Sequence, residues 1–273
     1  MRGPALHRVL LSILMTGMFL IAMGPSQAEQ SCQINIGYEP EPPYQYPDNK
    51  GQIIGIDADI LNTVLAELGC SIKYWMTPWK RTLASIESGK LDATMGASFK
   101  TQRAKFAHYS PSYRGQPHVV FLSAQNSIEV QNIQEFLERG LHLGVVNGWH
   151  YTNKIRALLD RPRYKGQVTE IPNFENLPKM LATGRVDGFI ANPSQLVNIV
   201  GKKPMKKDYR VIEGDMDRLH FLFSKKTVPP ELAKRINDHL SAKFKNGFFN
   251  EVCSKYESQL NSGCQYLEPK QIK

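Results

Sequence analysis

The stretch TPWKRTLASIESGKLDATMGASFKTQRAKFAHYSPSY, from Thr77 to Tyr113, predicts the fold class of the chain. Its first residue can cap a helix, Pro78 suits the first turn, and Gly89 suits the left-handed end. Residues 91–95 follow as a short buried strand, and a polar loop that carries Arg103 comes next. A helix, a strand and a loop at the strand's carboxyl end form one side of a ligand crevice in an open α/β sheet.

A second copy of this pattern lies in MLATGRVDGFIANPSQL, residues 180–196. There GRVDG, residues 184–188, repeats the order of GKLDA, residues 89–93. Two similar α/β halves predict a cleft between two lobes, with open sheets, flanking helices and a hinge between them.

Residues 1–28 have the composition of a cleaved signal peptide rather than of a membrane anchor. Arg2 and Arg8 make a basic start, residues 9–23 are apolar, and Ala28 ends a run of small residues that suits cleavage. The apolar run is short for a membrane span. We therefore expect a soluble, exported mature protein.

The net positive charge could attract nucleic acid, but its distribution along the chain argues against such a partner. Removing residues 1–28 takes away two arginines and no acid, which leaves 32 basic against 25 acidic side chains, a net charge of +7. The basic residues are scattered, and no basic motif interleaved with aromatics is present. The remaining chain can bury a large core, and we expect a monomer that needs no cofactor.

Four cysteines in an exported protein predict two disulfides. Cys32 and Cys70 each precede an expected strand, so they meet at one sheet edge if the two strands are parallel neighbours. Cys253 and Cys264 close a short loop near the C-terminus. The pairing Cys32–Cys70 with Cys253–Cys264 is the best of three connectivities. A zinc site is the alternative, but no Cys-x-x-Cys or histidine cluster supports it.

Periodicity predicts the other elements of the chain. The expected strands are 34–37, 71–75, 117–122, 141–146, 186–191, 209–212 and 219–224. The expected helices are 57–68, 133–139, 175–182, one that starts at Asn192-Pro193, one that opens at Pro229-Pro230, and 248–256.

The ordered set of segments resembles the family 3 extracellular solute-binding proteins. The segments that carry the resemblance are GIDADILNTVLAELG, W-x-R-x-L-x-x-I-x-x-G-K-L-D-A, T-x-R-A-K-F, Y-S-P-S-Y, LGVVNGWHY, GRVDGFIAN and PPELAKRINDHLSAKFKNGFFNEVCSKY. This family includes periplasmic receptors for polar amino acids that feed ABC importers. The resemblance implies lobe 1 at residues 33–117 and 221–268, lobe 2 at 118–220, and ABC permease subunits in the inner membrane as partners.

The resemblance also implies roles for residues of lobe 1. An arginine at the place of Arg103 binds the ligand's carboxylate, which suits a planar, two-pronged donor; a surface arginine that covers its neighbours is the alternative. Ser98 is the best candidate for a polar contact from the preceding loop, which is one residue shorter than in the amino-acid receptors. Trp79 stands where the family contacts ligand. Independently of the resemblance, Tyr38 and Tyr44 belong to a loop rich in proline and aromatic residues, where they either form a wall of the ligand site or pack within the loop.

In lobe 2, the expected site departs from the family pattern. In the amino-acid receptors, the residues of this wall are commonly small and polar. Trp149 and His150 are bulky and aromatic instead. His150 could act as a base or a metal ligand, but a hydrogen-bonding role suits it better because no partner carboxylate is evident. Asn192 stands where the family usually has an aspartate for the α-ammonium, and an amide cannot supply that charge; as an alternative it only caps a helix.

These observations predict a periplasmic protein that captures a small polar, carboxylate-bearing, amino-acid-like solute by hinge closure. Two rival interpretations remain. The chain could be a sensor module for a signalling partner, or an enzyme like the cyclohexadienyl dehydratases that resemble the family. No paired acid–base motif favours the enzyme, and no G-x-S-x-G elbow favours a hydrolase.

Overall fold

The structure is a computed structural model, and it describes residues 32–147, 149–200, 208–260 and 264. The predicted signal peptide, residues 1–28, lies outside the described residues.

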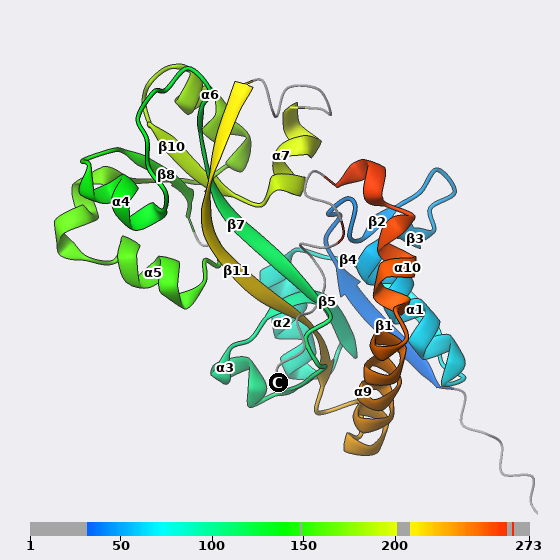
Figure 1. Cartoon of the computed structure of the whole chain (residues 1–273). Helices are drawn as coiled ribbons and strands as arrows, with labels where there is room; N and C mark the ends of the chain where they lie inside the picture. The colour runs from blue at the N-terminus through cyan, green and yellow to red at the C-terminus, as the bar shows by residue number, and fades with distance from the viewer. Residues whose placement is uncertain (1–31, 148, 201–207, 261–263, 265–273) are drawn as a thin grey trace, which may run out of the picture. The chain divides into compact units, whose positions relative to one another are not determined.

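A mixed sheet of nine strands forms the framework (Figure 1). Its strands are β1 (Gln33–Tyr38), β4 (Ser71–Met76), β5 (Ala93–Ser98), β6 (Ala107–Tyr109), β7 (Arg114–Ser123), β8 (Leu143–Val146), β9 (Val168–Ile171), β10 (Gly188–Ala191) and β11 (Tyr209–Ser224). The order is β4-β1-β5-β11-β7-β10-β8-β9, with β6 beside β11. A separate small sheet pairs β2 (Tyr46–Pro47) with β3 (Ile53–Ile54).

The two ends of the sheet are parallel, and long antiparallel strands join them. β1 pairs in parallel with β4 and β5, and β8 pairs in parallel with β9 and β10. Between these groups, β7 and β11 run side by side. The two predicted sheets are therefore connected, because the expected strands 209–212 and 219–224 are one strand of 16 residues. Its polar middle keeps pairing with β7 after a register shift between Ile212 and Asp215.

Helices cover both faces of each end of the sheet. The helices are α1 (Ile56–Glu67), α2 (Trp79–Ser88), α3 (Thr101–Ala104), α4 (Ile133–Glu138), α5 (Asn153–Leu159), α6 (Leu177–Ala182), α7 (Pro193–Val200), α9 (Pro230–Lys245) and α10 (Phe248–Ser254), with short 3₁₀ turns at η1 (Pro162–Gln167), η2 (Phe174–Asn176) and η3 (Glu257–Gln259). The expected helix 175–182 thus divides into η2 and α6.

Separate hydrophobic clusters lie at the two ends of the sheet. One end, which we call lobe 1, packs β1, β5 and the end of β11 against α1, α9 and α10 on one face and against α2 on the other. The other end, lobe 2, packs β8 and β10 against α4 and α5 on one face and against α6 on the other. The chain has the predicted α/β two-lobed fold; the boundaries at 117/118 and 220/221 stay predictions.

Two helix starts differ from the sequence expectation. Pro78, and not Thr77, is the N-cap of α2, and the Glu39 carboxylate accepts a hydrogen bond from the Trp79 N–H at 3.1 Å. The sequence also predicts Thr101 as the cap of a short helical turn, but Thr101 lies inside α3. A carboxylate from another loop can satisfy a free helix N–H as a local hydroxyl does, so the local pattern misplaced the start of α2. Gly89 ends α2 in the left-handed region, at φ 81°, as predicted.

The disulfides have the predicted pairing, Cys32–Cys70 and Cys253–Cys264. The parallel register sets Gln33 opposite Ser71. The preceding residues of both strands, Cys32 and Cys70, therefore meet at the same edge of the sheet.

The two disulfides should differ in their effect on stability. The bridged residues are 38 apart for Cys32–Cys70 and 11 apart for Cys253–Cys264. Each bridge should contribute about 2–4 kcal/mol, and because closure entropy grows with loop length, the longer loop should contribute about 1 kcal/mol more. Urea unfolding of the serine double variants, each without its own bridge, measures both values. A larger loss of stability without Cys253–Cys264 than without Cys32–Cys70 would contradict this dependence on loop length.

Candidate functional site

The carboxyl ends of the parallel strands bring the candidate residues toward the junction of the lobes. β5 ends at Ser98 and leads into α3, whereas β8 and β10 end at Val146 and Ala191. In open α/β sheets, ligands bind outside such strand ends. These ends supply most of the residues that the sequence analysis singled out.

Arg103 lies on α3, half-buried, between Ser98 and Trp79. Its Nη1 donates a hydrogen bond to the Ser98 carbonyl at 3.0 Å. The guanidinium lies 5.3 Å from the centre of the Trp79 ring. Burial lowers the pKa of Arg103, while Tyr109 and Asp217 oppose the change. Among the residues that the structure describes, no carboxylate lies within ion-pair distance of Arg103.

Ser98, Asp217 and His150 form a chain of polar contacts across the junction. The Ser98 hydroxyl donates to Asp217 Oδ2 at 2.6 Å, and His150 Nε2 lies 3.5 Å from the same oxygen. Asp217 belongs to β11, so this strand connects the end of β5 with the segment after β8. The sequence analysis missed Asp217, because it treated the middle of β11 as a break between strands.

That order of contacts does not suit a nucleophilic enzyme. A serine nucleophile needs a base that removes its proton, and a third group orients that base. Here the carboxylate lies between the hydroxyl and the imidazole. The arrangement can bind and orient polar groups.

An open cavity of about 550 Å³ borders this chain of contacts. Phe99, Lys100 and Thr101 line it from lobe 1, and Trp149, His150 and Arg156 line it from lobe 2. Trp149 also packs on Phe174, with 5.2 Å between ring centres. Trp79 and Arg103 are not among its lining residues. The predicted pairing of Trp79 with Trp149 around one ligand therefore stays a prediction.

A larger open cavity of about 870 Å³ shares Phe99 and His150 with the first. Its other walls include β11 around Asp217, the end of α9 with Phe244 and the start of α10 with Phe249. The two cavities therefore adjoin each other around Phe99 and His150.

Of the remaining candidates, Tyr44 and Asn192 lie at a second, buried contact between the lobes, whereas Tyr38 lies in the core of lobe 1. Tyr44 precedes α1, and its hydroxyl lies 3.0 Å from the Ser194 hydroxyl on α7. Asn192 caps α7, since its Oδ1 accepts from the Ser194 N–H at 3.0 Å. Tyr38 packs edge-on against Tyr74 in the core of lobe 1.

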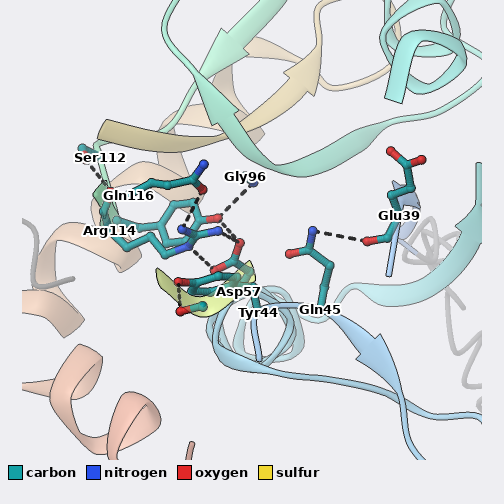
Figure 2. A network of polar contacts seen from close by, with 10 residues as sticks. Glu39, Tyr44, Gln45, Asp57, Gly96, Ser112, Arg114 and Gln116 are labelled. Atoms are coloured by element: carbon teal, nitrogen blue, oxygen red, sulfur yellow. Dashed lines mark hydrogen bonds and ion pairs between the residues drawn. The ribbon is translucent and has the colours of Figure 1, made fainter. Parts of the chain in front are cut away.

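The ring of Tyr44 packs against a buried ion pair between Arg114 and Asp57 (Figure 2). Arg114 Nε donates to Asp57 Oδ1 at 2.7 Å and its Nη2 to Oδ2 at 2.9 Å. The guanidinium lies 3.7 Å from the centre of the Tyr44 ring, and Tyr113 donates to Asp57 at 2.5 Å. Arg114 and Asp57 are completely buried. The sequence analysis missed this pair, although Asp57 lies three and four residues before Ile60 and Leu61 on the apolar face of α1.

We expect His118 to make the free energy of unfolding depend on pH. This buried residue of β7 lies near Asp215, Asp217 and His150. Burial lowers the pKa of His118; Asp217 opposes this, His150 adds to it, and Asp215 opposes it. The folded state then binds fewer protons than the unfolded chain, so the stabilising effect is present above about pH 6.5 and declines as pH falls below that value.

We expect His118→Gln to weaken the loss of stability between pH 6.5 and pH 5. Urea midpoints at several pH values measure the slope, and other histidines account for the part that remains. His142→Gln, at an exposed position, is the control. An equal slope in wild type and His118→Gln would contradict the assignment.

Comparisons with known proteins show the family of the chain. The model of the bacterial extracellular solute-binding proteins, family 3, matches residues 34–259. A relative named "Probable histidine-binding protein", from Neisseria gonorrhoeae, is 23% identical over 218 residues, which cover 78% of this chain and 78% of that protein.

Solved structures share the fold. A histidine kinase sensor domain similar to periplasmic binding proteins has a TM-score of 0.64 at 16% identity and covers 83% of this chain and 96% of its own. An ancestral amino-acid-binding protein, described as a precursor of cyclohexadienyl dehydratase, has a TM-score of 0.62 at 19% identity and covers 82% of this chain and 95% of its own.

Two lobes, joined by long strands and meeting at the ends of parallel strands, define a periplasmic binding protein fold of type II. Within that class, the chain belongs to the bacterial extracellular solute-binding proteins, family 3. None of the described helices is long and apolar enough to cross a membrane. Among the described residues, no group of histidine, cysteine and acidic side chains could hold a metal ion.

Proposed function

We propose that the protein captures a small polar, carboxylate-bearing, amino-acid-like solute in the periplasm and passes it to an ABC importer. Arg103 carries this proposal. Its guanidinium is half-buried beside Trp79, and its bond to the Ser98 carbonyl leaves other donors for a ligand. A planar guanidinium that has no acidic partner among the described residues suits a carboxylate bound in two-pronged geometry.

Asn192 narrows the class of solute. Its amide oxygen caps α7, and it brings no negative charge to this contact between the lobes. A free α-ammonium would therefore lack the aspartate that amino-acid receptors of the family usually provide. The solute is a carboxylate without a free α-amino group, a peptide or a modified amino acid.

A thermal-shift screen tests this class, because a ligand that binds only the folded state raises the melting temperature. The screen compares carboxylates without an α-amino group, short peptides and modified amino acids with the standard amino acids. We expect the melting temperature to rise with compounds of the first three groups and not with the standard amino acids. Strong stabilisation by arginine, glutamine or histidine that persists in Arg103→Met would refute the proposal.

Closure of the lobes is the expected mechanism. A ligand at Arg103 and at the Trp149–His150 segment must touch both lobes, and hinge closure around ligands is a common device in this fold. Small-angle scattering with the best compound from the screen should give a smaller radius of gyration than the ligand-free protein. If a crystal structure without ligand shows the lobes open, an unchanged radius of gyration would count against closure.

The protein that receives the bound solute distinguishes two versions of this function, delivery to an importer and signalling. Delivery requires ABC permease subunits, whereas a sensor requires a signalling protein. The similar fold of a histidine kinase sensor domain supports the sensor as an alternative. Reconstitution of the protein with candidate permeases in liposomes distinguishes them, since solute uptake that depends on the protein supports delivery. We propose a monomer, so that one cleft serves one permease.

Catalysis is the less favoured alternative. A dehydratase needs a general acid held close to the bound carboxylate. His150 contacts Asp217 and is the nearest candidate, but burial lowers its pKa and the nearby cations Lys100, Arg103 and Arg156 lower it further, against the opposing effect of Asp217. A neutral imidazole is a poor proton donor. Unchanged cyclohexadienyl carboxylates after incubation would support binding without turnover.

A further inference from the structure

We propose that the solute carries a second anionic group, bound by Lys100 and Arg156, so that the protein selects small organic dianions. This inference rests on the proposed function and narrows its substrate class. The two cations face the 550 Å³ cavity from opposite lobes, Lys100 just before α3 and Arg156 from α5.

The cavity is unbalanced in charge. Its described lining includes the cations Lys100 and Arg156 and the imidazole of His150, but no carboxylate. A concave site lined by one sign of charge concentrates ions of the opposite sign. The nearest acid to His150, Asp217, already accepts a hydrogen bond from the Ser98 hydroxyl.

Lys100 is held in place without an anion. Its backbone N–H donates to the Tyr109 hydroxyl at 3.0 Å, which fixes the chain before α3. No carboxylate of the described residues lies within ion-pair distance of its ammonium. Burial lowers the pKa of Lys100, and Arg103 lowers it further, while Asp217 opposes the change. A bound anion would relieve this crowding of like charges.

Arg156 can turn toward the same anion. Its Nη1 lies 3.6 Å from both Asp160 and Glu170, and the guanidinium lies 5.5 Å from the centre of the Tyr151 ring. Such partly exposed pairs are weak, and two loose contacts leave donors free. A ligand anion between Lys100 and Arg156 would connect the two lobes.

Two cationic positions imply two anionic groups. Arg103 lies toward Trp79 and does not line the cavity, whereas Lys100 and Arg156 do. A single carboxylate at Arg103 would leave Lys100 without a carboxylate partner among the described residues, and Arg156 with only its two loose contacts. A short carbon chain with an anionic group at each end would satisfy both positions, and Trp149 would cover its apolar middle.

Matched pairs of probes test the inference. Succinate, glutarate and adipate are compared with their monomethyl esters, and 3-phosphonopropionate replaces one carboxylate by a phosphonate; calorimetry gives each Kd at low salt. We expect at least one dianion to bind about tenfold or more tightly than its monoester, as is typical of a charge-assisted contact. Stronger binding of the phosphonate would place a phosphoryl-type group at Lys100 and Arg156.

Variants locate the second group. Lys100→Met and Arg156→Met should each bring the dianion close to the affinity of its monoester and leave the monoester unchanged. Lys105→Met, an exposed lysine just after α3, is the control and should keep the wild-type difference.

Equal affinities for dianion and monoester, or equal effects of Lys100→Met and Lys105→Met, would overturn this inference and leave the proposed carboxylate receptor intact. Failure of every carboxylate probe to bind, together with a native ligand that bears no acid, would overturn both.

Discussion

Asp57→Asn should lower the free energy of unfolding by about 3–5 kcal/mol, because it leaves the buried guanidinium of Arg114 without its counter-charge. Arg114 and Asp57 are completely buried, and two hydrogen bonds of 2.7 and 2.9 Å join them. Tyr44 packs on the same guanidinium and contacts Ser194 of lobe 2. Loss of the Asp57 carboxylate should therefore also disturb the contact of Tyr44 with Ser194 at the junction of the lobes.

Two further variants make this prediction specific. Asp238→Asn removes an exposed pair with Lys234 and should cost less than about 1 kcal/mol. The double variant Asp57→Leu/Arg114→Met should recover much of the lost stability, since apolar residues can replace a buried pair at little cost. Urea unfolding measures all three. A loss below about 1 kcal/mol for Asp57→Asn would contradict a buried, energetically coupled pair.

Local patterns predicted the fold well because they depend on short-range chemistry. Gly89 closes α2, the parallel register brings Cys32 beside Cys70, and the apolar periodicity of α1 and α9 marks their buried faces. The continuous strand β11 was missed, since its polar middle pairs with β7 over a long sequence distance. Pairing of this kind leaves no local signal.

The candidate site was less predictable for the same reason. Asp217 contacts Ser98 across 119 residues, and Arg114 contacts Asp57 across 57 residues. An aspartate on the apolar face of a predicted helix is a usable signal, because a buried carboxylate requires a partner. The identity of that partner follows only from the folded chain.

Arg103→Met should nearly abolish binding of the solute. Loss of a charge-assisted pair in a closed cleft costs about 2–5 kcal/mol, much of it from the unpaired ligand group, so Kd should rise roughly 30- to 5,000-fold. Arg103→Lys should restore only part of the affinity, because an ammonium cannot form the two-pronged contact.

The fold of these variants needs a separate check, since Arg103 also bonds the Ser98 carbonyl. An unchanged circular dichroism spectrum and melting temperature without ligand would show that the loss concerns binding. Lys105→Met is the matched control, as an exposed cation in the same segment. Wild-type affinity in a folded Arg103→Met protein would exclude Arg103 from the site.

The identity of the native solute tests the central claim most directly. The exported protein is purified gently, native mass spectrometry counts the bound molecules, and the released compound is identified after denaturation. We predict one small carboxylate-bearing molecule per chain, other than a standard amino acid, and its absence from Arg103→Met purified in parallel. A solute that bears no acidic group, or one retained equally by Arg103→Met, would contradict the account.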